Sequence, residues 1–320
     1  MRHDSGKKVS RVLNLSPDDL EFASHRVIAT PMRSSSALDA RIGRTIYVKD
    51  ETVQHGGSFK FRGAILGVKN AARGVVAAGA GNFPIAVGLA ARALDKPACL
   101  VVPHDVPDFK RAQVMGTGAE IRFTERSDLA ACARSEAQNR SWTNLHAFES
   151  KEMVAGSYTL GSEIAAAIQE KGAAKDAIVV ACGGGGLAAG VSLALRSRSI
   201  DAAIHIVEPQ THRRYAKARE AGMPIRISPS GETICDALKP LQIGTLAFEV
   251  LERSDVQVSA VDDGPVREAV SLLREMYGIR AEPSGALAMA AVLGGVVGKE
   301  NDRLWVIACG GNVQPCGTES

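Results

Sequence analysis

Aromatic residues are scarce in this chain of 320 residues, making up only 4% of it. An excess of charge of one sign is lacking too, because 38 Lys and Arg stand against 35 Asp and Glu. Nucleic-acid binding needs a clustered basic face, commonly with stacking aromatic side chains, so we expect no nucleic-acid partner. The densest basic stretch, residues 213–219, is short and has helical spacing, which favours a solvated helix face.

The sequence also lacks a long hydrophobic run without interruption. Residues 74–91 and 177–195 are uncharged, but glycines interrupt both runs, and the first also contains Asn82 and Pro84. A bilayer core tolerates such interruptions only where protein surrounds them, so each run is better explained as a buried strand, a glycine loop and a buried helix. The first residues show no apolar stretch after their charges, and we expect neither a signal peptide nor a membrane partner.

Cysteine and histidine patterns typical of metal sites are missing as well. The six cysteines, Cys316 among them, form no CxxC pair, and the seven histidines stand singly without zinc-ligand spacing. Isolated thiols in apolar surroundings are typical of a reduced, cytoplasmic protein. We therefore expect a cytoplasmic location and no bound metal.

What the sequence does contain is an alternation of short β-branched runs with segments of helical length. Continuous apolar runs indicate strands buried on both faces of a parallel sheet. The candidate strands are residues 98–102, 120–123, 177–181, 204–207 and 304–308. An amphipathic helix is expected over residues 262–277, with Gly278 after its end. The predicted fold class is α/β, with helices on both faces of the sheet.

The first of four chemical motifs is GGSFKFRGA, residues 56–64, which places Lys60 between two phenylalanines. Burial near apolar side chains lowers the pKa of an ammonium group, and the free amine can then form an imine. The alternative is a lysine that reaches water at the start of a helix.

The second motif is CGGGGLAAG, residues 182–190, directly after a predicted strand. Its glycines expose backbone N–H groups, and the following helix adds the positive end of its dipole, so the loop is suited to a phosphate. It lacks the lysine of a nucleoside-triphosphate loop. It does satisfy GxGxxA, with Asp201 at a suitable distance, so a nicotinamide-dependent oxidoreductase remains an alternative.

Two further motifs end predicted strands. GAGNFP, residues 79–84, exposes another helix N-terminus that is suited to a carboxylate or phenolate oxygen. CGGNV, residues 309–313, places Cys309 where ligands gather in open α/β sheets. Taken singly, a plain turn and a buried structural thiol would also explain them.

In this order, the four motifs resemble those of the fold-type II pyridoxal-phosphate enzymes, and most closely the serine/threonine dehydratase (ammonia-lyase) and serine racemase family. The resemblance extends from Thr30 to the GGN motif and includes Glu163, Val207–Pro209 and Ala281–Ala286. It implies two open, twisted, mostly parallel sheets of the tryptophan synthase β type. It further implies a large cofactor domain of residues 1–70 and 149–320, a small mobile domain of residues 71–148, and a homodimer.

The resemblance also implies roles for single residues. Lys60 would bind the aldehyde of pyridoxal 5'-phosphate covalently and move the α-proton. Phe59 would pack against the cofactor ring, Asn82 would donate to its phenolate oxygen, and Cys309 would face the pyridine nitrogen, which a thiol leaves largely unprotonated. The other implied cofactor contacts are Gly183, Gly184, Gly185, Gly186, Leu187 and Glu282. The implied substrate contacts are Ser58, Gly79, Ala80, Gly81, Asn82 and Phe83.

The implied reaction is α,β-elimination of water from a β-hydroxy amino acid, which gives a 2-oxo acid and ammonia. A β-replacement synthase of the same fold, and a cofactor-binding protein that has lost dehydratase activity, remain alternatives. Three polar positions of the family's substrate loop are apolar or absent here, so we expect a substrate bulkier or more apolar than serine or threonine. Ala80 replaces the serine with which racemases of this family donate a proton, which disfavours racemisation. Arg213 and Arg214 stand where an acidic cation ligand would follow Glu208, so we expect no cation there.

Overall fold

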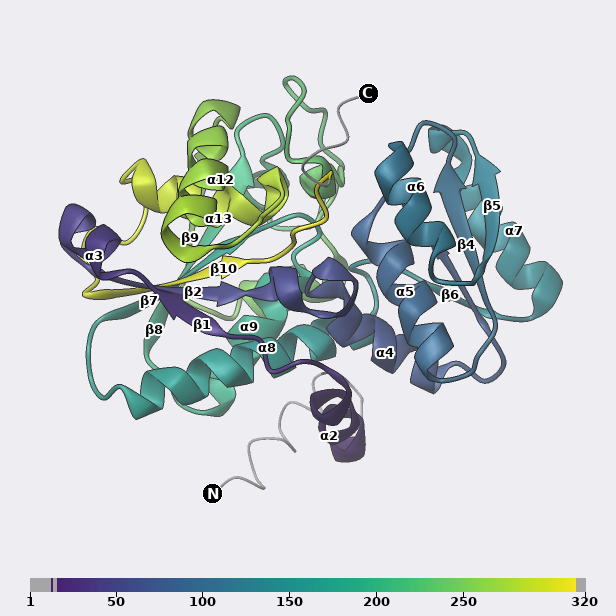
Figure 1. The fold of residues 1–320 in the computed structure, drawn as a ribbon, viewed down its shortest axis with the longest axis horizontal. Coiled ribbons are helices and arrows are strands. Elements are labelled where there is room, and N and C mark those ends of the chain that lie inside the picture. Colours follow the sequence, from purple (N-terminus) through teal and green to yellow (C-terminus); the bar gives the residue numbers. More distant parts are fainter. Residues whose placement is uncertain (1–12, 14–15, 315–320) are drawn as a thin grey trace.

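The computed structural model describes residue 13 and residues 16–314, which form two sheets with helices around them (Figure 1). The strands are β1 (Met32–Ser34), β2 (Thr45–Asp50), β3 (Val75–Ala78), β4 (Ala98–Pro103), β5 (Glu120–Thr124), β6 (Thr143–Leu145), β7 (Asp176–Ala181), β8 (Ala202–Pro209), β9 (Val256–Val261) and β10 (Arg303–Ala308). The larger sheet has the order β1-β2-β10-β7-β8-β9 and the smaller one β5-β4-β3-β6. Neighbouring strands run parallel except β1 and β2. The predicted α/β fold with two mostly parallel sheets is confirmed.

The helices connect these strands and cover the sheets. They are α2 (Pro17–Arg26), α3 (Ser36–Ile42), α4 (Lys60–Asn70), α5 (Asn82–Ala93), α6 (Asp108–Met115), α7 (Leu129–Arg140), α8 (Lys151–Glu170), α9 (Gly186–Ser197), α10 (Arg214–Ala221), α11 (Thr245–Leu251), α12 (Asp263–Tyr277) and α13 (Pro283–Leu293). The predicted amphipathic helix is α12, and Gly278 follows it with φ +66°, the left-handed conformation that favours glycine at a helix end.

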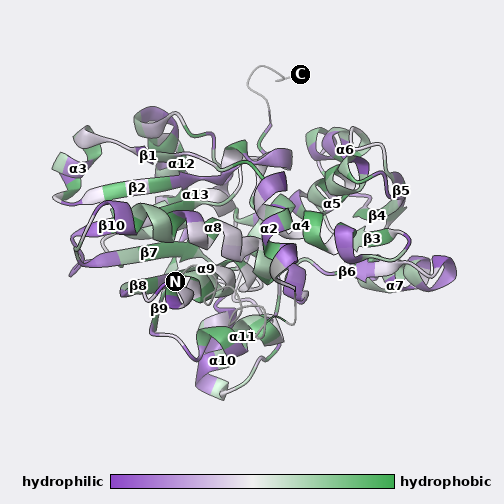
Figure 2. Cartoon of the chain, turned by 90° about the horizontal axis from the view of Figure 1, so that it is seen from below, coloured by the Kyte–Doolittle hydropathy of each residue, from purple (hydrophilic) through white to green (hydrophobic). Residues whose placement is uncertain are grey.

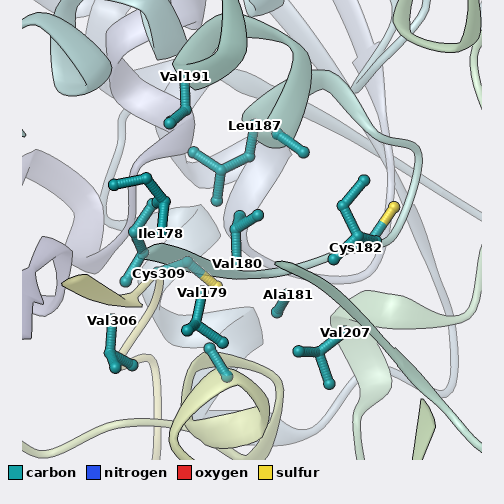
Figure 3. Close-up of a cluster of buried hydrophobic side chains, with 14 of the residues drawn as sticks. Ile178, Val179, Val180, Ala181, Cys182, Leu187, Val191, Val207, Val306 and Cys309 are labelled. Carbon is teal, nitrogen blue, oxygen red and sulfur yellow. The ribbon is translucent and has the colours of Figure 1, made fainter. Parts of the chain in front are cut away.

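Both faces of the larger sheet are covered. Figure 1 shows α8 and α9 on one face and α12 and α13 on the other. Every residue of β7 is buried, and Figure 2 shows this strand in the hydrophobic colour over most of its length. In Figure 3, Val180 points toward Leu187 and Val191 of α9, whereas Val179 points to the opposite side. Burial of each such side chain stabilises the fold by about 1.5–3 kcal/mol, which explains why these strands are continuous apolar runs.

The smaller sheet takes all its strands from one stretch of the chain. Residues 75–145 supply β3, β4, β5 and β6, and the chain then returns to the larger sheet through α8. Figure 1 shows this part, with α5, α6 and α7, beside the larger sheet. It falls within the small domain expected for residues 71–148, whose boundaries and mobility stay predictions.

One expectation from the charge pattern is confirmed only in part. Of the basic residues in 213–219, Arg213, Lys217 and Arg219 are exposed as expected, whereas Arg214 at the start of α10 is 0% exposed. Helical spacing of basic residues does not reveal which of them the surrounding chain covers. The reason for the burial of Arg214 is a set of carbonyl groups from other loops, described below.

Two other expectations can be compared with the described residues only in part. No helix within them is long and apolar enough to cross a bilayer. The five cysteines that the structure describes are free thiols, and Cys316 lies outside the described residues.

Candidate active site

A cavity of about 360 Å³ lies between the two sheets and collects loops from both. The carboxyl ends of β3, β7 and β10 open into it, because each of these strands is followed by one of the glycine motifs. Every residue that the sequence suggested for the cofactor or substrate lines this cavity except Ser58. Ser58 is 0% exposed, and its Oγ has no hydrogen-bond partner among the described residues.

Four helices begin at the wall of the cavity. They are α4 at Lys60, α5 at Asn82, α9 at Gly186 and α13 at Pro283. Within the described structure none of the four has a side chain that caps its first N–H groups. Unsatisfied N–H groups and the positive ends of helix dipoles favour anions. The cavity is therefore suited to a ligand with more than one negative charge.

Lys60 supplies the amine of the site. Its Nζ donates to the carbonyl oxygen of Ala147 at 2.9 Å and lies 4.8 Å from the centroid of the Phe59 ring. Burial lowers the pKa of the Lys60 amine to about 8. A neutral amine is the form that attacks an aldehyde, so this environment prepares Lys60 for imine formation.

The glycine loop after β7, residues 183–186, is shaped by close neighbours. A Cβ added to Gly184 would overlap the Phe148 ring, and Gly185 has φ +85°, which favours glycine. The loop leads into α9, whose first residues bring backbone N–H groups to the cavity. Leu187 points down into the core, where Figure 3 shows it near Val180.

The Lys60 amine and the glycine loop together indicate which cofactor the cavity can hold. The bare peptide groups at residues 183–186 suit a phosphate, and the Lys60 amine suits an aldehyde. A cavity of about 360 Å³ is within the size range of small-molecule sites. The donor set therefore fits pyridoxal 5'-phosphate, which carries both groups.

Asn82 and Glu282 meet across the cavity from different sheets. Asn82 Nδ2 donates to Glu282 Oε1 at 2.6 Å, and Asn82 Oδ1 accepts from Asn312 Nδ2 at 2.8 Å. Burial raises the pKa of the Glu282 carboxyl, which is 6% exposed. The amide of Asn82 is thereby held in one orientation at the edge of the site.

Cys309 follows β10 and is also nearly covered, at 6% exposure. Its Sγ lies 3.7 Å from the carbonyl oxygen of Ser284. Burial raises the pKa of the Cys309 thiol to about 12, so this group is neutral at physiological pH.

Sequence reasoning missed Lys110, a residue of α6 beside the smaller sheet. Its side chain is nearly buried and lines the cavity, with Nζ 3.2 Å from Asp236 Oδ2. A Cβ added to Gly81 would lie 3.5 Å from this Nζ, so the cation stands beside the loop after β3. The available signal was its position: Lys110 follows the carboxyl end of β4, where ligands collect in parallel sheets.

Phe83 contributes less to the cavity than its place in the loop suggests. It lines the wall, but it is only 6% exposed and packs into the apolar cluster of the smaller sheet. Phe148 and Leu129 add further apolar surface to the wall.

The structure does not bring Asp201 to the glycine loop. Asp201 directly precedes β8 and lines a different surface pocket, at the end of the sheet where β7 and β8 begin. The glycine loop follows the opposite end of β7. Asp201 is therefore not placed to contact the ribose of a dinucleotide bound at the glycine loop, and the oxidoreductase alternative loses the carboxylate on which it rested.

Glu208 is used within the fold. Its carboxylate accepts from the backbone N–H groups of Tyr215 and Ala216 at 2.8 and 3.0 Å. Among the described residues, no group of three or more His, Cys, Asp or Glu could hold a metal ion. The expectation that no cation binds near Glu208 stays a prediction.

Known proteins resemble this chain over most of its length. A family model described as "Pyridoxal-phosphate dependent enzyme" matches residues 23–310. An L-threo-3-hydroxyaspartate ammonia-lyase from Pseudomonas sp is 31% identical over 291 residues, which cover 89% of this chain and 90% of that protein. A serine racemase from Arabidopsis thaliana is 32% identical over 296 residues, covering 89% and 88%. The solved structure of a threonine deaminase from T.th. superposes with a TM-score of 0.85 at 31% identity and covers 93% of this chain and 98% of that one.

Proposed function

Because this chain belongs to the family of pyridoxal-phosphate dependent enzymes, we propose that it is a lyase that eliminates water from a β-hydroxy amino acid. The products are a 2-oxo acid and ammonia, because the water lost in the elimination is taken up again when the released enamine hydrolyses. The observation that carries the proposal is the meeting of the Lys60 amine and a bare glycine loop in one cavity.

Backbone groups and a few side chains are proposed to hold the cofactor. The N–H groups of Gly183 to Leu187 would bind its phosphate, with the N-terminus of α9 behind them. Phe59 and Asn82 would contact the ring and its phenolate oxygen, and Cys309 would face the ring nitrogen. Glu282 supports this arrangement, since its carboxyl group fixes the Asn82 amide. When bound, pyridoxal phosphate supplies the electron sink that makes the α-proton of the substrate acidic.

Lys60 is the proposed proton carrier. Its Nζ would take the α-proton from the substrate as the Cα–H bond breaks, and this proton would pass to the β-hydroxyl, which leaves as water. The lowered pKa of the Lys60 amine, about 8, matches a base that works near neutral pH. The carbonyl oxygen of Ala147 accepts a hydrogen bond from Nζ and orients the amine toward the cavity.

Lys110 resolves the apparent lack of donors for the substrate carboxylate. The loop of residues 79–83 has no polar side chain except Asn82, but Lys110 Nζ stands beside Gly81 and the N-terminus of α5 begins there. A hydrogen bond to a charged group is worth about 1.5–3 kcal/mol, and the ammonium would supply one such bond to the substrate carboxylate. We propose that Lys110 and the N–H groups at the start of α5 bind the carboxylate. Asp236, which pairs with Lys110, would limit the free charge before substrate arrives.

The finer features rest on the resemblance. We propose a homodimer in the cytoplasm, with residues 71–148 moving as a small domain over the substrate. Ala80 lines the cavity without a proton to give, which supports elimination over racemisation. The cavity's apolar wall at Phe148 and Leu129 supports a side chain larger than that of serine.

Two measurements test this function. Borohydride reduction of the yellow holoprotein should fix the cofactor on Lys60, as shown by the mass of the peptide, and the Lys60→Ala protein should stay unlabelled.

Serine, threonine, threo-3-hydroxyaspartate and 3-phenylserine should then be compared for release of 2-oxo acid. A yellow protein that releases none contradicts the lyase, and a product that has gained an added thiol indicates β-replacement. Rapid conversion of L-serine to D-serine would contradict the argument from Ala80, and threonine turnover far above that of 3-phenylserine would contradict a bulky substrate.

A further inference from the structure

Arg214 takes no part in the proposed reaction, yet its guanidinium lies directly behind the glycine loop. The residue is 0% exposed. Its Nη1 donates to the carbonyl oxygens of Cys182 at 2.7 Å and Gly183 at 3.2 Å, and its Nη2 donates to that of Leu238 at 2.7 Å. Complete burial of a charge is costly unless hydrogen bonds hold it. Here three carbonyl groups bind the two Nη atoms, while the buried Nε has no hydrogen-bond partner among the described residues.

The hydrogen bonds of Arg214 determine which way the loop's peptide groups face. In a trans peptide the C=O and the following N–H point in opposite directions, and the described chain has no cis peptide. Since the carbonyls of Cys182 and Gly183 point to Arg214, the N–H groups of Gly183 and Gly184 point away from it. Both glycines line the cavity. The carbonyl of Gly184 accepts from the N–H of Gly244 at 3.0 Å, which holds the next peptide in the same manner.

The start of the helix that carries Arg214 is itself anchored. Glu208 accepts from the N–H groups of Tyr215 and Ala216 and so fixes the first turn of α10, where Arg214 begins the helix. Figure 2 shows α10 beside α11, and the Tyr215 ring meets Phe248 of α11 edge-on at 6.3 Å between centroids. Leu238, the third acceptor of Arg214, also lines the cavity, so one side chain joins two segments of its wall.

We propose that Arg214 is a positioning residue for the cofactor phosphate. Its guanidinium holds the carbonyls of Cys182 and Gly183 away from the cavity and thereby keeps the N–H groups of the glycine loop aimed at the phosphate. The inference rests on the proposed function, in which this loop binds the phosphate of pyridoxal phosphate. The positive charge of the guanidinium, directly behind the loop, also attracts a phosphate dianion bound in front of it.

The experiment compares two ligands that differ only in the phosphate. Full-length protein is freed of cofactor, and its Kd values for pyridoxal phosphate and for pyridoxal are measured by absorbance titration. The first variant is Arg214→Met, which removes the donors but fills much of the volume. The second is Arg214→Lys, which keeps a charge but has one donor nitrogen and cannot bind the carbonyls of residues 182–183 and of Leu238 together. The matched control is Arg213→Met, because Arg213 is the neighbouring residue and is exposed. Circular dichroism of the cofactor-free proteins verifies that each variant folds.

We expect the Kd for pyridoxal phosphate to rise about tenfold or more in Arg214→Met, by the loss of roughly one charge-assisted hydrogen bond to the phosphate. Arg214→Lys should show a smaller rise, and it carries the test if the Met variant does not fold. The Kd for pyridoxal should stay within about twofold, since pyridoxal has no phosphate for the loop to bind. Arg213→Met should leave both values unchanged.

Equal losses for both ligands would overturn the inference, because Arg214 would then support the fold in general. Unchanged affinity for pyridoxal phosphate in the Arg214 variants would overturn it as well. The proposed function fails in a different way: the wild-type protein itself would then bind no pyridoxal phosphate at Lys60, whatever the variants do.

Discussion

The loop after β7 and the loop after β3 share a glycine-rich pattern, but different groups hold them. Residues 184–186 of the first are buried. The Arg214 guanidinium and the backbone N–H of Gly244 donate hydrogen bonds to the loop's carbonyls. Residues 79–82 of the second are half-buried. Their main links across the cavity are side chains: the Asn82 amide to Glu282 and Asn312, and nearby Lys110 to Asp236.

The difference matches two tasks. A cofactor that stays bound through many reaction cycles needs donors fixed in place before it arrives, and a loop held by the body of the fold supplies them at little entropic cost. A substrate enters and leaves at every cycle, and a few side-chain contacts across a cavity can break and form again. Under the proposed function, the same local motif would serve a rigid cofactor site and an adjustable substrate site, and the tertiary contacts would decide which.

The largest effect should come from adding one methyl group to the loop after β7. Gly184→Ala would place a Cβ in the Phe148 ring, so either the loop or the ring must move. We expect about a hundredfold loss of pyridoxal phosphate affinity, measured by absorbance titration of the cofactor-free protein.

Gly81→Ala is the matched change in the loop after β3. The atom nearest to its added Cβ is Lys110 Nζ, at 3.5 Å, which is an ordinary contact. Cofactor affinity should stay within about twofold, with the effect confined to KM for the substrate. Equal losses of cofactor affinity in the two variants would contradict the division of tasks between the loops.

The second prediction concerns Lys110, which we assign to the adjustable site. Lys110→Ala should raise KM roughly ten- to 150-fold, the worth of one hydrogen bond to a charged group, and leave the Kd for pyridoxal phosphate unchanged. Steady-state kinetics and cofactor titration separate the two effects. Lys69→Ala is the control, the same substitution at another lysine. Lys69 pairs with Asp19 on α2 and does not line the cavity. A loss of cofactor affinity in Lys110→Ala would instead assign Lys110 to the rigid site that binds the cofactor.

The third prediction uses the pH dependence of Lys60, which stands between the loops. Only the neutral amine attacks an aldehyde, and its fraction rises with pH up to the pKa. With the pKa of Lys60 at about 8, the rate of pyridoxal uptake should rise about tenfold per pH unit below 8 and level off above it. Stopped-flow absorbance with cofactor-free protein measures this rate. A rate that keeps rising beyond pH ~9.5 would mean that the amine is not shielded from water.

The sequence indicated much of this site, because its signals are local. Glycine runs after apolar strands and a lysine between phenylalanines can be recognised without neighbours, and parallel topology brings such strand ends together. Lys110 and Arg214 could not be assigned in the same way. Whether a charged helix residue faces water depends on segments far away in the sequence: for Arg214 these are residues 182–183 and 238, and for Lys110 they include Asp236. The charge pattern of one helix does not reveal whether carbonyl groups of another loop face that helix.

The smallest effect is expected at the third loop, after β10. Cys309 carries a neutral thiol, because burial raises its pKa to about 12, and a serine hydroxyl is neutral as well. Cys309→Ser should therefore keep kcat within about threefold, since neither group can protonate a pyridine nitrogen. Cys309→Asp is the contrasting change: a buried carboxyl beside Glu282, which already interacts with this thiol, would bring a second acid to the same wall. If Cys309→Ser instead abolished activity while the cofactor stayed bound, the thiol itself would be a reacting group, and the loop after β10 would no longer be the passive member of the three.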